Sequence, residues 1–412
     1  MKLLIYEDGK FDNFYPLTYL RASWELRCGA FSLRQRIEQL FPGVQVGLWA
    51  RDLLVPVLRR RYPDRPVNDL DALKGDDVLL VNGRALLTGP VDVRDIGAVK
   101  SGEELVYALL PKEKAAECSG LEDLLALAES LPSEQKDVRV VQYLWDLVSE
   151  NPNFIERDFD RFGPKVLGKL HPTAVVYGPE DRVYIGEGAE VHPYVVLDTR
   201  GGPVIVDRGV EVHPFTRIEG PSYIGPDCIL LGAKIREGCS FGPVCRIGGE
   251  VEESIVQGYS NKYHDGFLGH AYVGEWVNLG ALTTNSDLKN DYSTVQVYLK
   301  GQWVDTGELK VGAFIGDHTK TSIGTLLNTG TIIGIMCNIV GAGALPPKYV
   351  PPFSLFVNGK IMKGFGLKYL LEIARTAMGR RKMELSPEEE ALLKAIYDAT
   401  KGERAEAVKK FR

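Results

Sequence analysis

At 412 residues, with 44% apolar and 25% charged residues, the chain has the length of two or three domains and the composition of a globular protein. Its formal charge of −6 argues against a general nucleic-acid binder. The apolar run at the N-terminus is too short for a signal peptide and no stretch reaches membrane-spanning length, so we expect a cytoplasmic protein that does not bind membranes. Six scattered cysteines without a C-x-x-C pair predict reduced thiols rather than disulfides or a zinc site.

Residues 1–165 alternate short apolar runs with amphipathic segments. Apolar runs predict buried strands at 2–6, 44–50 and 76–84, and helical spacing predicts helices at 33–41 and 121–131. This alternation is typical of an α/β domain with a mainly parallel sheet. Ligands of such sheets bind beyond the carboxyl ends of the strands, so we expect functional loops after Tyr6 and Val81.

Residues 166–347 follow a six-residue period that fits neither a helix nor a simple strand. The repeating aliphatic positions include Ile185, Val191, Leu197, Val206, Val212, Ile218, Ile224, Leu230, Ile229, Ile235, Phe241, Ile247, Val273, Leu279, Ile315, Leu327, Ile333 and Ile339, with Thr321 in one slot. In hexapeptide repeats, each unit forms one side of a triangular coil and points one aliphatic inward. The period therefore predicts a left-handed parallel β-helix, interrupted near 248–254 and over about 285–310.

Residues 348–412 form a third, helical segment. Three prolines in "GALPPKYVPP" end the repeats, and residues 367–382 have the apolar spacing of an amphipathic helix. A second helix begins after Ser386, with Pro387 at its first position and Glu389 completing a capping box.

The most polar stretch of the β-helix is 260–291, which holds several histidines, acids, asparagines and a lysine. A histidine near neutral pKa is the natural base for acyl transfer to an amine, which makes His264 a candidate. Isolated histidines at coil corners are otherwise surface residues, as we expect for His192 and His213. A metal site built from His264, Asp265 and His270 fits no standard ligand spacing.

The same stretch resembles the acetyltransferase motif of the GlmU-type bifunctional family, which reads K-x-G-H-x-x-Y-x-G, then V-N-x-G-A and a segment with asparagine and lysine. His264 stands fourteen residues before Asn278 in "WVNLGA", as in the family, and "AKIREG" is similar to the family's "ARLRPG". The resemblance implies a catalytic pair and a sugar-phosphate or acyl-transfer site. The implied residues are His264 and Glu250 for catalysis, and Arg236, Asn278, Asn285 and Lys289 for the sugar-phosphate or acyl-transfer site.

Two positions depart from this motif. The motif tyrosine is Phe267, and the sugar-binding lysine twelve residues before the histidine is Glu252. A four-residue expansion around "CRIGGEVEES" accompanies them. These departures leave the identity of the acceptor open.

The N-terminal segment resembles a divergent branch of the sugar nucleotidyltransferases, with a P-L-T-x-x-R signature followed by R-x-G. The arginines and the backbone N–H groups of this turn would bind the nucleotide phosphates. The loop "LVNGRALL" lacks the family's usual metal-binding aspartate. Asp146 is a candidate second metal ligand. The implied nucleotide-binding residues are Arg21, Arg27, Gly29, Asn82 and Arg84, with a solvated helix face as the competing interpretation of the arginines.

Together, the resemblance implies a sugar-phosphate transferase of nucleotide-sugar synthesis. It would N-acetylate an amino-sugar 1-phosphate such as glucosamine 1-phosphate with acetyl-CoA and transfer a nucleotidyl group from a nucleoside triphosphate, aided by Mg²⁺, to give UDP-GlcNAc or a related nucleotide sugar. The family's β-helices imply a homotrimer. Two alternatives remain: a nucleotidyltransferase whose β-helix serves assembly or regulation, and a non-catalytic scaffold or sensor.

Overall fold

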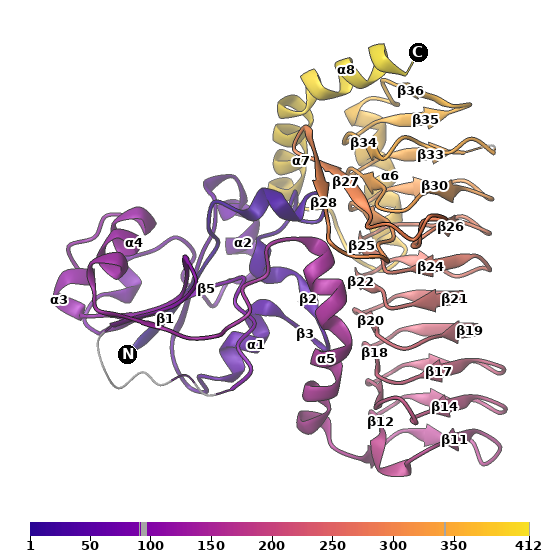
Figure 1. Cartoon of the computed structure of the whole chain (residues 1–412), viewed down its shortest axis with the longest axis horizontal. Coiled ribbons are helices and arrows are strands. Elements are labelled where there is room, and N and C mark those ends of the chain that lie inside the picture. The colour runs from indigo at the N-terminus through magenta and orange to yellow at the C-terminus, as the bar shows by residue number, and fades with distance from the viewer. Residues whose placement is uncertain (90, 92–96, 342, 412) are drawn as a thin grey trace. The chain divides into compact units, whose positions relative to one another are not determined.

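The computed structural model describes residues 1–89, 91, 97–341 and 343–411, which divide into two compact units (Figure 1). Unit 1 comprises Met1–Phe14, Leu20–Leu26 and Phe31–Tyr143, and unit 2 comprises Tyr15–Tyr19, Arg27–Ala30 and Leu144–Arg412. Two short N-terminal segments thus belong to unit 2. The domain boundary expected after residue 165 stays a prediction, because helix α5 (Leu144–Phe162) clusters with unit 2.

Unit 1 is built on a six-stranded sheet in the order β4-β1-β5-β7-β6-β8. Its strands are β1 (Lys2–Tyr6), β4 (Val46–Trp49), β5 (Val78–Asn82), β6 (Gly97–Ser101), β7 (Glu104–Leu110) and β8 (Ser133–Gln135). The parallel pairing of β1 with β4 and β5 confirms the three predicted strands. The sheet is mixed rather than mainly parallel, because β6 and β7 form a hairpin at Gly102, whose φ of 60° suits glycine, and β7 runs antiparallel to β5.

Short helices connect these strands. They are α1 (Leu33–Gln39), α2 (Val55–Arg61), α3 (Lys112–Ala115) and α4 (Leu121–Ser130). Helix α1 begins with a capping box in which the Ser32 hydroxyl accepts from the Gln35 backbone and the Gln35 side chain accepts from the Ser32 backbone. Both predicted helices are confirmed, each one or two residues shorter than its apolar pattern.

Unit 2 contains the predicted parallel β-helix, whose strands stack on three faces (Figure 1). One face stacks β9 (Lys165–Val166), β12 (Val183–Ile185), β15 (Val204–Val206), β18 (Ser222–Ile224), β20 (Cys239–Phe241), β22 (Ile255–Gly258), β25 (Tyr272–Glu275), β29 (Phe314–Ile315), β32 (Ile332–Ile333) and β34 (Tyr349–Val350). A second stacks β10 (Lys169–Leu170), β13 (Glu190–Val191), β16 (Glu211–Val212), β19 (Ile229–Ile235), β21 (Arg246–Glu252), β23 (Asn261–Lys262), β30 (Lys320–Thr321), β33 (Asn338–Val340) and β35 (Leu355–Val357), which β36 (Lys360–Met362) closes. The third stacks β11 (Val175–Tyr177), β14 (Val196–Asp198), β17 (Arg217–Glu219), the ends of β19 and β21, β24 (Phe267–Gly269), β26 (Thr284–Asn285) and β31 (Leu326–Leu327).

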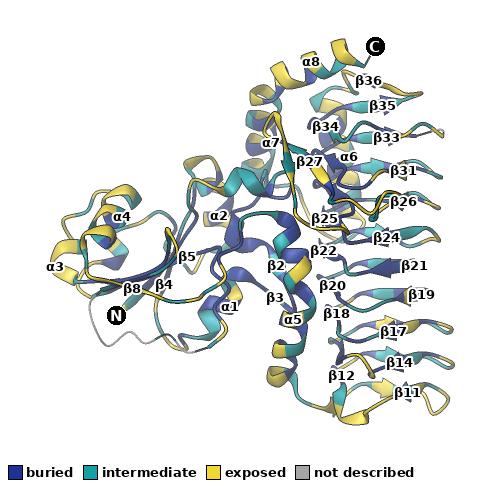
Figure 2. Ribbon diagram, in the orientation of Figure 1, coloured by how far each residue is buried: buried dark blue, intermediate teal, exposed yellow. Residues whose placement is uncertain are grey.

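The hexapeptide aliphatics fill the interior of this coil (Figure 2). From Ile185 to Ile339 the predicted inward positions are at most 3% exposed, with the exception of Ile229, and Thr321 fills its slot at 7%. Ile229 is only half-buried because Leu230 takes the inward position, and the step from Leu230 to Ile235 is five residues instead of six. Coils in this region therefore advance by 15 to 18 residues, shorter than the 21 of the first coils.

In the described part of the β-helix, an insertion interrupts the coil between Asn285 and Phe314, whereas the interruption expected near 248–254 is wrong, because strand β21 runs through Arg246–Glu252 and pairs with β23 and β24. Tyr272 pairs with Phe314, 42 positions later, although the next coil advances by only 18. The inserted chain forms an antiparallel hairpin, β27 (Gln296–Leu299) and β28 (Gln302–Asp305). Its neck is closed where the Val311 N–H donates to the Asp287 carbonyl at 2.8 Å, so the coil resumes where it stopped.

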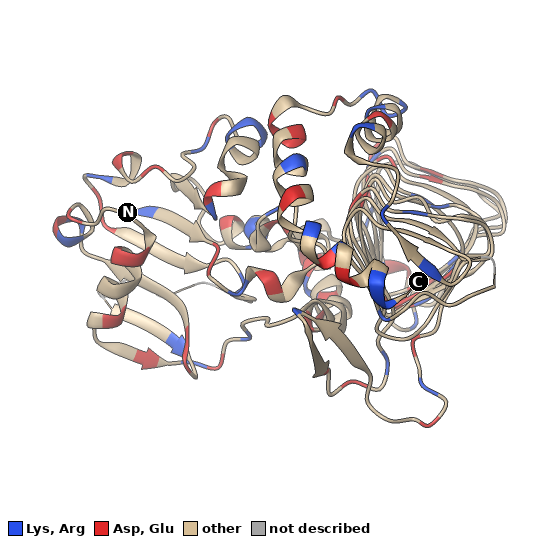
Figure 3. Ribbon diagram, turned by 90° about the horizontal axis from the view of Figure 1, so that it is seen from above, with Lys and Arg blue, Asp and Glu red and all other residues tan. Residues whose placement is uncertain are grey.

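Three helices follow the β-helix: α6 (Leu367–Gly379), α7 (Pro387–Ala399) and α8 (Lys401–Lys410). The capping box at Ser386 is confirmed, with reciprocal bonds of 3.2 and 3.0 Å to Glu389. Charges of both signs alternate along the helices, while the β-helix ribbons are mostly uncharged (Figure 3). In the described part of the chain, no helix combines the length and apolarity that crossing a membrane requires.

Candidate functional site

His264 lies on an exposed turn of the β-helix, between β23 and β24. Among the residues that the structure describes, neither of its ring nitrogens has a hydrogen-bond or ion-pair partner, and its ring packs edge-on against Tyr263 at 6.0 Å between centroids. The imidazole is therefore open to solvent.

Glu250, the implied partner of His264, lies on the neighbouring coil. Its backbone N–H donates to the Gly266 carbonyl at 3.1 Å, which brings the two residues to the same region of the coil stack. No hydrogen bond joins the carboxylate to the imidazole within the described residues. Asn278 lies on the second face, level with Asn261 of β23, and its side-chain oxygen accepts from Asn261 at 3.1 Å.

The other implied sugar-phosphate residues have internal partners. Asn285 is 2% exposed, and its amide bonds both the N–H and the C=O of Gly269, at 3.0 and 2.9 Å. It stands six residues after Leu279 and so occupies an inward slot. Lys289 lies in the insertion and bonds the Ser293 hydroxyl, with Asp291 at 3.6 Å.

Lys262 is a buried cation inside the coil, directly beneath His264. It is 4% exposed, and its ammonium donates to the carbonyls of Gly248 at 2.9 Å and His264 at 2.8 Å. Burial lowers the pKa of Lys262 to about 8, although Asp265 and Glu250 oppose that change. The lysine therefore ties the His264 turn to the coil below it.

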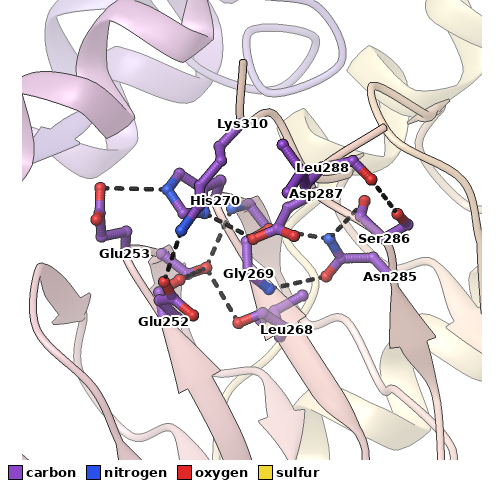
Figure 4. Close-up of polar contacts among 12 residues, drawn as sticks. Glu252, Glu253, Leu268, Gly269, His270, Asn285, Ser286, Asp287, Leu288 and Lys310 are labelled. Carbon is purple, nitrogen blue, oxygen red and sulfur yellow. Dashed lines mark hydrogen bonds and ion pairs between the residues drawn. The ribbon is translucent and has the colours of Figure 1, made fainter. Parts of the chain in front are cut away.

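A compact charge cluster lies at the ends of β19, β21 and β24 (Figure 4). Its cations are Arg236, His270 and Lys310, and its carboxylates are Glu252, Glu253 and Asp287. Glu252 is 4% exposed and lies between Arg236, at 2.8 Å, and Lys310, at 3.1 Å. Position 252, where the motif has a lysine, holds a glutamate here. A lysine from the C-terminal end of the insertion, Lys310, contacts this glutamate.

His270 forms the second half of the cluster. Its Nδ1 faces Asp287 at 2.9 Å and its Nε2 faces Glu253 at 3.3 Å. Burial by itself would lower the pKa of His270, but the bonds to Asp287 and Glu253 raise it to about 9. The ring is therefore protonated at neutral pH and serves as a charge partner rather than a base.

Although Glu252, Glu253 and His270 are close enough to hold a metal ion, their ligand atoms already have partners. An imidazolium has no lone pair for a metal, and both oxygens of Glu252 face cations. Three carboxylates balance three cations. We interpret the cluster as a cross-link between successive coils.

In unit 1, side chains from the loops after β1 and β5 contact one another. Arg84 is fully buried, and its guanidinium bonds Asp8 at 3.0 Å, Glu104 at 2.9 Å and the Val141 carbonyl at 2.6 Å. Asn82 is 2% exposed and also donates to Asp8, at 3.2 Å. The side chains of Asn82 and Arg84, both implied to bind the nucleotide, therefore donate hydrogen bonds to Asp8.

The remaining implied nucleotide-binding residues divide between the units. Arg21 is buried in unit 1, where its carbonyl accepts from Arg51 at 3.3 Å. Arg27 and Gly29 belong to unit 2, where the Arg27 N–H donates to the Tyr272 hydroxyl at 2.6 Å and the Gly29 N–H donates to Asn151 at 2.7 Å. Asp146 also belongs to unit 2, on α5.

Several residues of this region were missed by sequence reasoning. Lys262 could have been found, because it stands six residues before Leu268 in an aliphatic slot. Lys310 could not, since the insertion places it 58 positions from its partner Glu252. The role of Glu253 and Asp287 likewise depends on which coils are adjacent.

Comparison with known proteins gives a family for the first part of the chain. Residues 3–164 match the model of a family described as sugar nucleotidyl transferase. A bifunctional sugar-1-phosphate nucleotidylyltransferase/acetyltransferase of Sulfurisphaera tokodaii is 35% identical over 118 residues, 29% of this chain and 27% of that protein. The bifunctional protein GlmU of an Azoarcus species is 30% identical over 282 residues, 66% of this chain and 54% of that protein. The matched parts thus span about a quarter to a half of these relatives.

A solved structure, that of an Arabidopsis UDP-N-acetylglucosamine acyltransferase, aligns over 59% of this chain and 95% of its own length. Its sequence identity is 13% and its TM-score 0.23, so the β-helix is assigned from the chain's own strand pairing.

Proposed function

Because residues 3–164 belong to the sugar nucleotidyl transferase family, we propose that this chain makes a nucleotide sugar in two steps. The β-helix would N-acetylate an amino-sugar 1-phosphate with acetyl-CoA, and the α/β unit would transfer a nucleotidyl group to the sugar phosphate from a nucleoside triphosphate. The observation that carries the first step is His264, a solvent-open histidine on a hexapeptide coil, at the position where the GlmU-type motif has its histidine. The Sulfurisphaera tokodaii relative, whose name gives both activities, supports the pairing.

In the acetylation step, the amine nitrogen of the sugar attacks the thioester carbonyl carbon of acetyl-CoA. A C–N bond forms and the C–S bond breaks, giving an amide and the thiolate of CoA. His264 accepts the proton that the amine loses and can return it to the departing thiolate. Glu250, on the adjacent coil, would favour the protonated imidazole electrostatically.

The acceptor's phosphate would lie along the same edge of the coil. Arg236 and Lys310 both contact the carboxylate of Glu252, and each side chain remains more than 40% exposed. Their solvent-exposed N–H groups would donate hydrogen bonds to the phosphate oxygens. Asn278 would contact the sugar, while Asn285 holds the coil together, and Lys289 would extend the positive edge.

His264 is tested by measuring the release of free CoA thiol with glucosamine 1-phosphate and related amino-sugar phosphates. We expect His264→Ala to lower kcat/KM by about 10²- to 10⁴-fold, the usual contribution of a general base. His171→Ala is the matched control, since His171 is also exposed on a coil corner and bonds only Thr173 at the side-chain level. Unchanged kcat/KM in His264→Ala would contradict the assignment.

A second candidate is nucleotidyl transfer alone, with the β-helix serving assembly or regulation. The substitution of Glu252 for the motif lysine and the absent bond between His264 and Glu250 favour it. Pyrophosphate release from a nucleoside triphosphate and a sugar 1-phosphate, without any CoA turnover on the amino sugars, would select this candidate. Absence of both activities and of ligand binding would select the scaffold.

Within the described residues of unit 1, the carboxylates near the ends of β1 and β5 already have cationic partners. The carboxylates of Asp8 and Glu104 are bound to Arg84, and Glu7 is paired with Arg51 at 2.7 Å. These residues do not fit a metal site of their own, so the proposed step assigns no role to an ion.

We also propose a cytoplasmic homotrimer. The cysteines support a reducing compartment, because all six are free thiols and five are buried. Light scattering of the purified chain tests the trimer, and a monomer at micromolar concentration would contradict it.

A further inference from the structure

A cavity of about 290 Å³ opens in unit 2, away from the His264 edge. Its walls come from three parts of the chain: the hairpin β27–β28, the segment around β34, and helix α8. None of the residues assigned to acetylation or nucleotidyl transfer lines it. A volume of this size is at the lower end for small-molecule sites and suits a ligand smaller than a nucleotide.

Aromatic rings form one side of the cavity. Tyr298 packs against Trp303 with 5.3 Å between ring centroids and against Tyr349 with 5.9 Å. Trp303 is 57% exposed, which leaves much of its surface available to a ligand. Aromatic faces carry negative electrostatic potential, and tryptophan binds cations best of the aromatic side chains.

Two carboxylates of α8 also line the cavity. Glu403 and Glu406 stand three residues apart on α8 and so lie on one side of the helix. Burial raises the pKa of Glu403, whose carboxyl shares a hydrogen bond with the Tyr349 hydroxyl. In the described chain, the Glu406 carboxylate has no hydrogen bond or ion pair.

The lysines of the cavity do not neutralise these carboxylates. The ammonium of Lys348 donates to the Thr329 carbonyl, to the Thr329 hydroxyl at 3.0 Å and to the Gln296 carbonyl at 3.4 Å. An ammonium has three donors, and all three are used. Lys410 lies over the ring of Phe411, at 5.5 Å from its centroid, instead of on Glu406.

We propose that this cavity binds a small organic cation, a primary alkylammonium or guanidinium of a few carbons. Its charge would lie between the faces of Tyr298 and Trp303 and the carboxylates of Glu403 and Glu406, and its alkyl part would contact the aromatic rings. The site is independent of the proposed transferase activity. Aromatic faces with nearby carboxylates are the chemistry that selects such cations over sugars and phosphates.

Isothermal titration calorimetry on the full chain tests the site, with agmatine and putrescine as probes. Glucose 1-phosphate is the anionic comparison and glucose the neutral one. We expect saturable binding of the cations that weakens with added NaCl, because exposed charges are screened. No saturation by either cation up to about 10 mM, or tighter binding of glucose 1-phosphate, would overturn the proposal.

Variants locate the binding. Removing a cation–π or carboxylate partner is worth about fivefold in affinity, so Trp303→Ala and Glu406→Gln should each weaken agmatine by at least that factor. Glu372→Gln, an exposed glutamate on α6 outside the cavity, is the matched control and should leave affinity unchanged. Both cavity side chains are solvent-exposed, so the variants should fold, which circular dichroism checks. Equal affinity in all four proteins would place any binding elsewhere and refute the site.

Discussion

The two buried cations near the His264 turn should give the stability of the β-helix opposite pH dependences. Lys262 has its pKa lowered from 10.5 to about 8 in the folded chain, whereas His270 has its pKa raised from 6.5 to about 9. Stability rises with pH wherever the unfolded chain binds more protons. Between pH 8 and 10.5 the unfolded chain retains the Lys262 proton that the folded chain has lost. Between pH 6.5 and 9 it is the folded chain that retains the His270 proton.

The magnitudes follow from about 1.4 kcal/mol per pH unit of difference in pKa. The Lys262 contribution to the free energy of unfolding should rise by about 2.5 kcal/mol between pH 7 and pH 10. The His270 contribution is fully present below pH 6.5 and should fall by about 3 kcal/mol between pH 6 and pH 9. Both side chains are less than a tenth exposed, so solvent screening reduces these values little.

Urea unfolding monitored by circular dichroism at several pH values measures how much Lys262 and His270 each contribute to the free energy of unfolding. The proteins to compare are the wild type, Lys262→Met and His270→Gln. Groups that titrate in every protein, such as the buried Lys320, cancel in the differences. The stability of the wild type relative to Lys262→Met should increase with pH, and relative to His270→Gln it should decrease. Differences that stay constant within about 0.5 kcal/mol across pH 6–10 would refute the assigned burial and partners.

Other variants test the internal networks by urea midpoint. Arg84→Met leaves Asp8 without its cation and Glu104 with Lys10 alone, so we expect a loss of about 3–5 kcal/mol, and a loss below 1 kcal/mol would contradict the buried ion pairs. Asn285→Ala removes both bonds to the Gly269 peptide and should cost about 2–3 kcal/mol. Asn278 is half-buried and has one side-chain hydrogen bond, so Asn278→Ala should cost less than about 1 kcal/mol. Equal losses of stability in the two variants would show that the buried hydrogen bonds of Asn285 do not stabilise the coil.

The fold could be predicted because its determinants are local and repetitive. One inward aliphatic every six residues places each side of a coil, and the capping box at Ser386 marks a helix start by itself. The mixed order of the unit 1 sheet could not be predicted, because pairing direction depends on the β6–β7 hairpin and not on the apolar character of β5. The five-residue step from Leu230 to Ile235 likewise could not be predicted from the six-residue period, because it depends on how neighbouring coils pack.

The candidate site divides in the same way. His264 and Asn278 could be placed on successive coils because both lie within uninterrupted repeats. The network of Glu252 and Lys310 required knowing that the insertion returns to its starting point. Sequence reasoning also assigned Asn285 to the sugar, because an asparagine in a motif does not reveal whether its amide faces solvent or a neighbouring peptide group.

The two ends of the insertion lie side by side, which has a consequence for engineering and for evolution. The neck of the insertion is held by the Leu288–Lys310 bridge and the bond from Val311 to Asp287, while the coils on either side pair directly with each other. Doubling a loop's length costs only about 0.6 kcal/mol in closure entropy, so we expect residues 289–309 to tolerate exchange for a hairpin that keeps the buried apolar positions Val295, Val297 and Leu299. A single recombination event could replace the hairpin wall of the cation cavity and leave every coil of the scaffold in register.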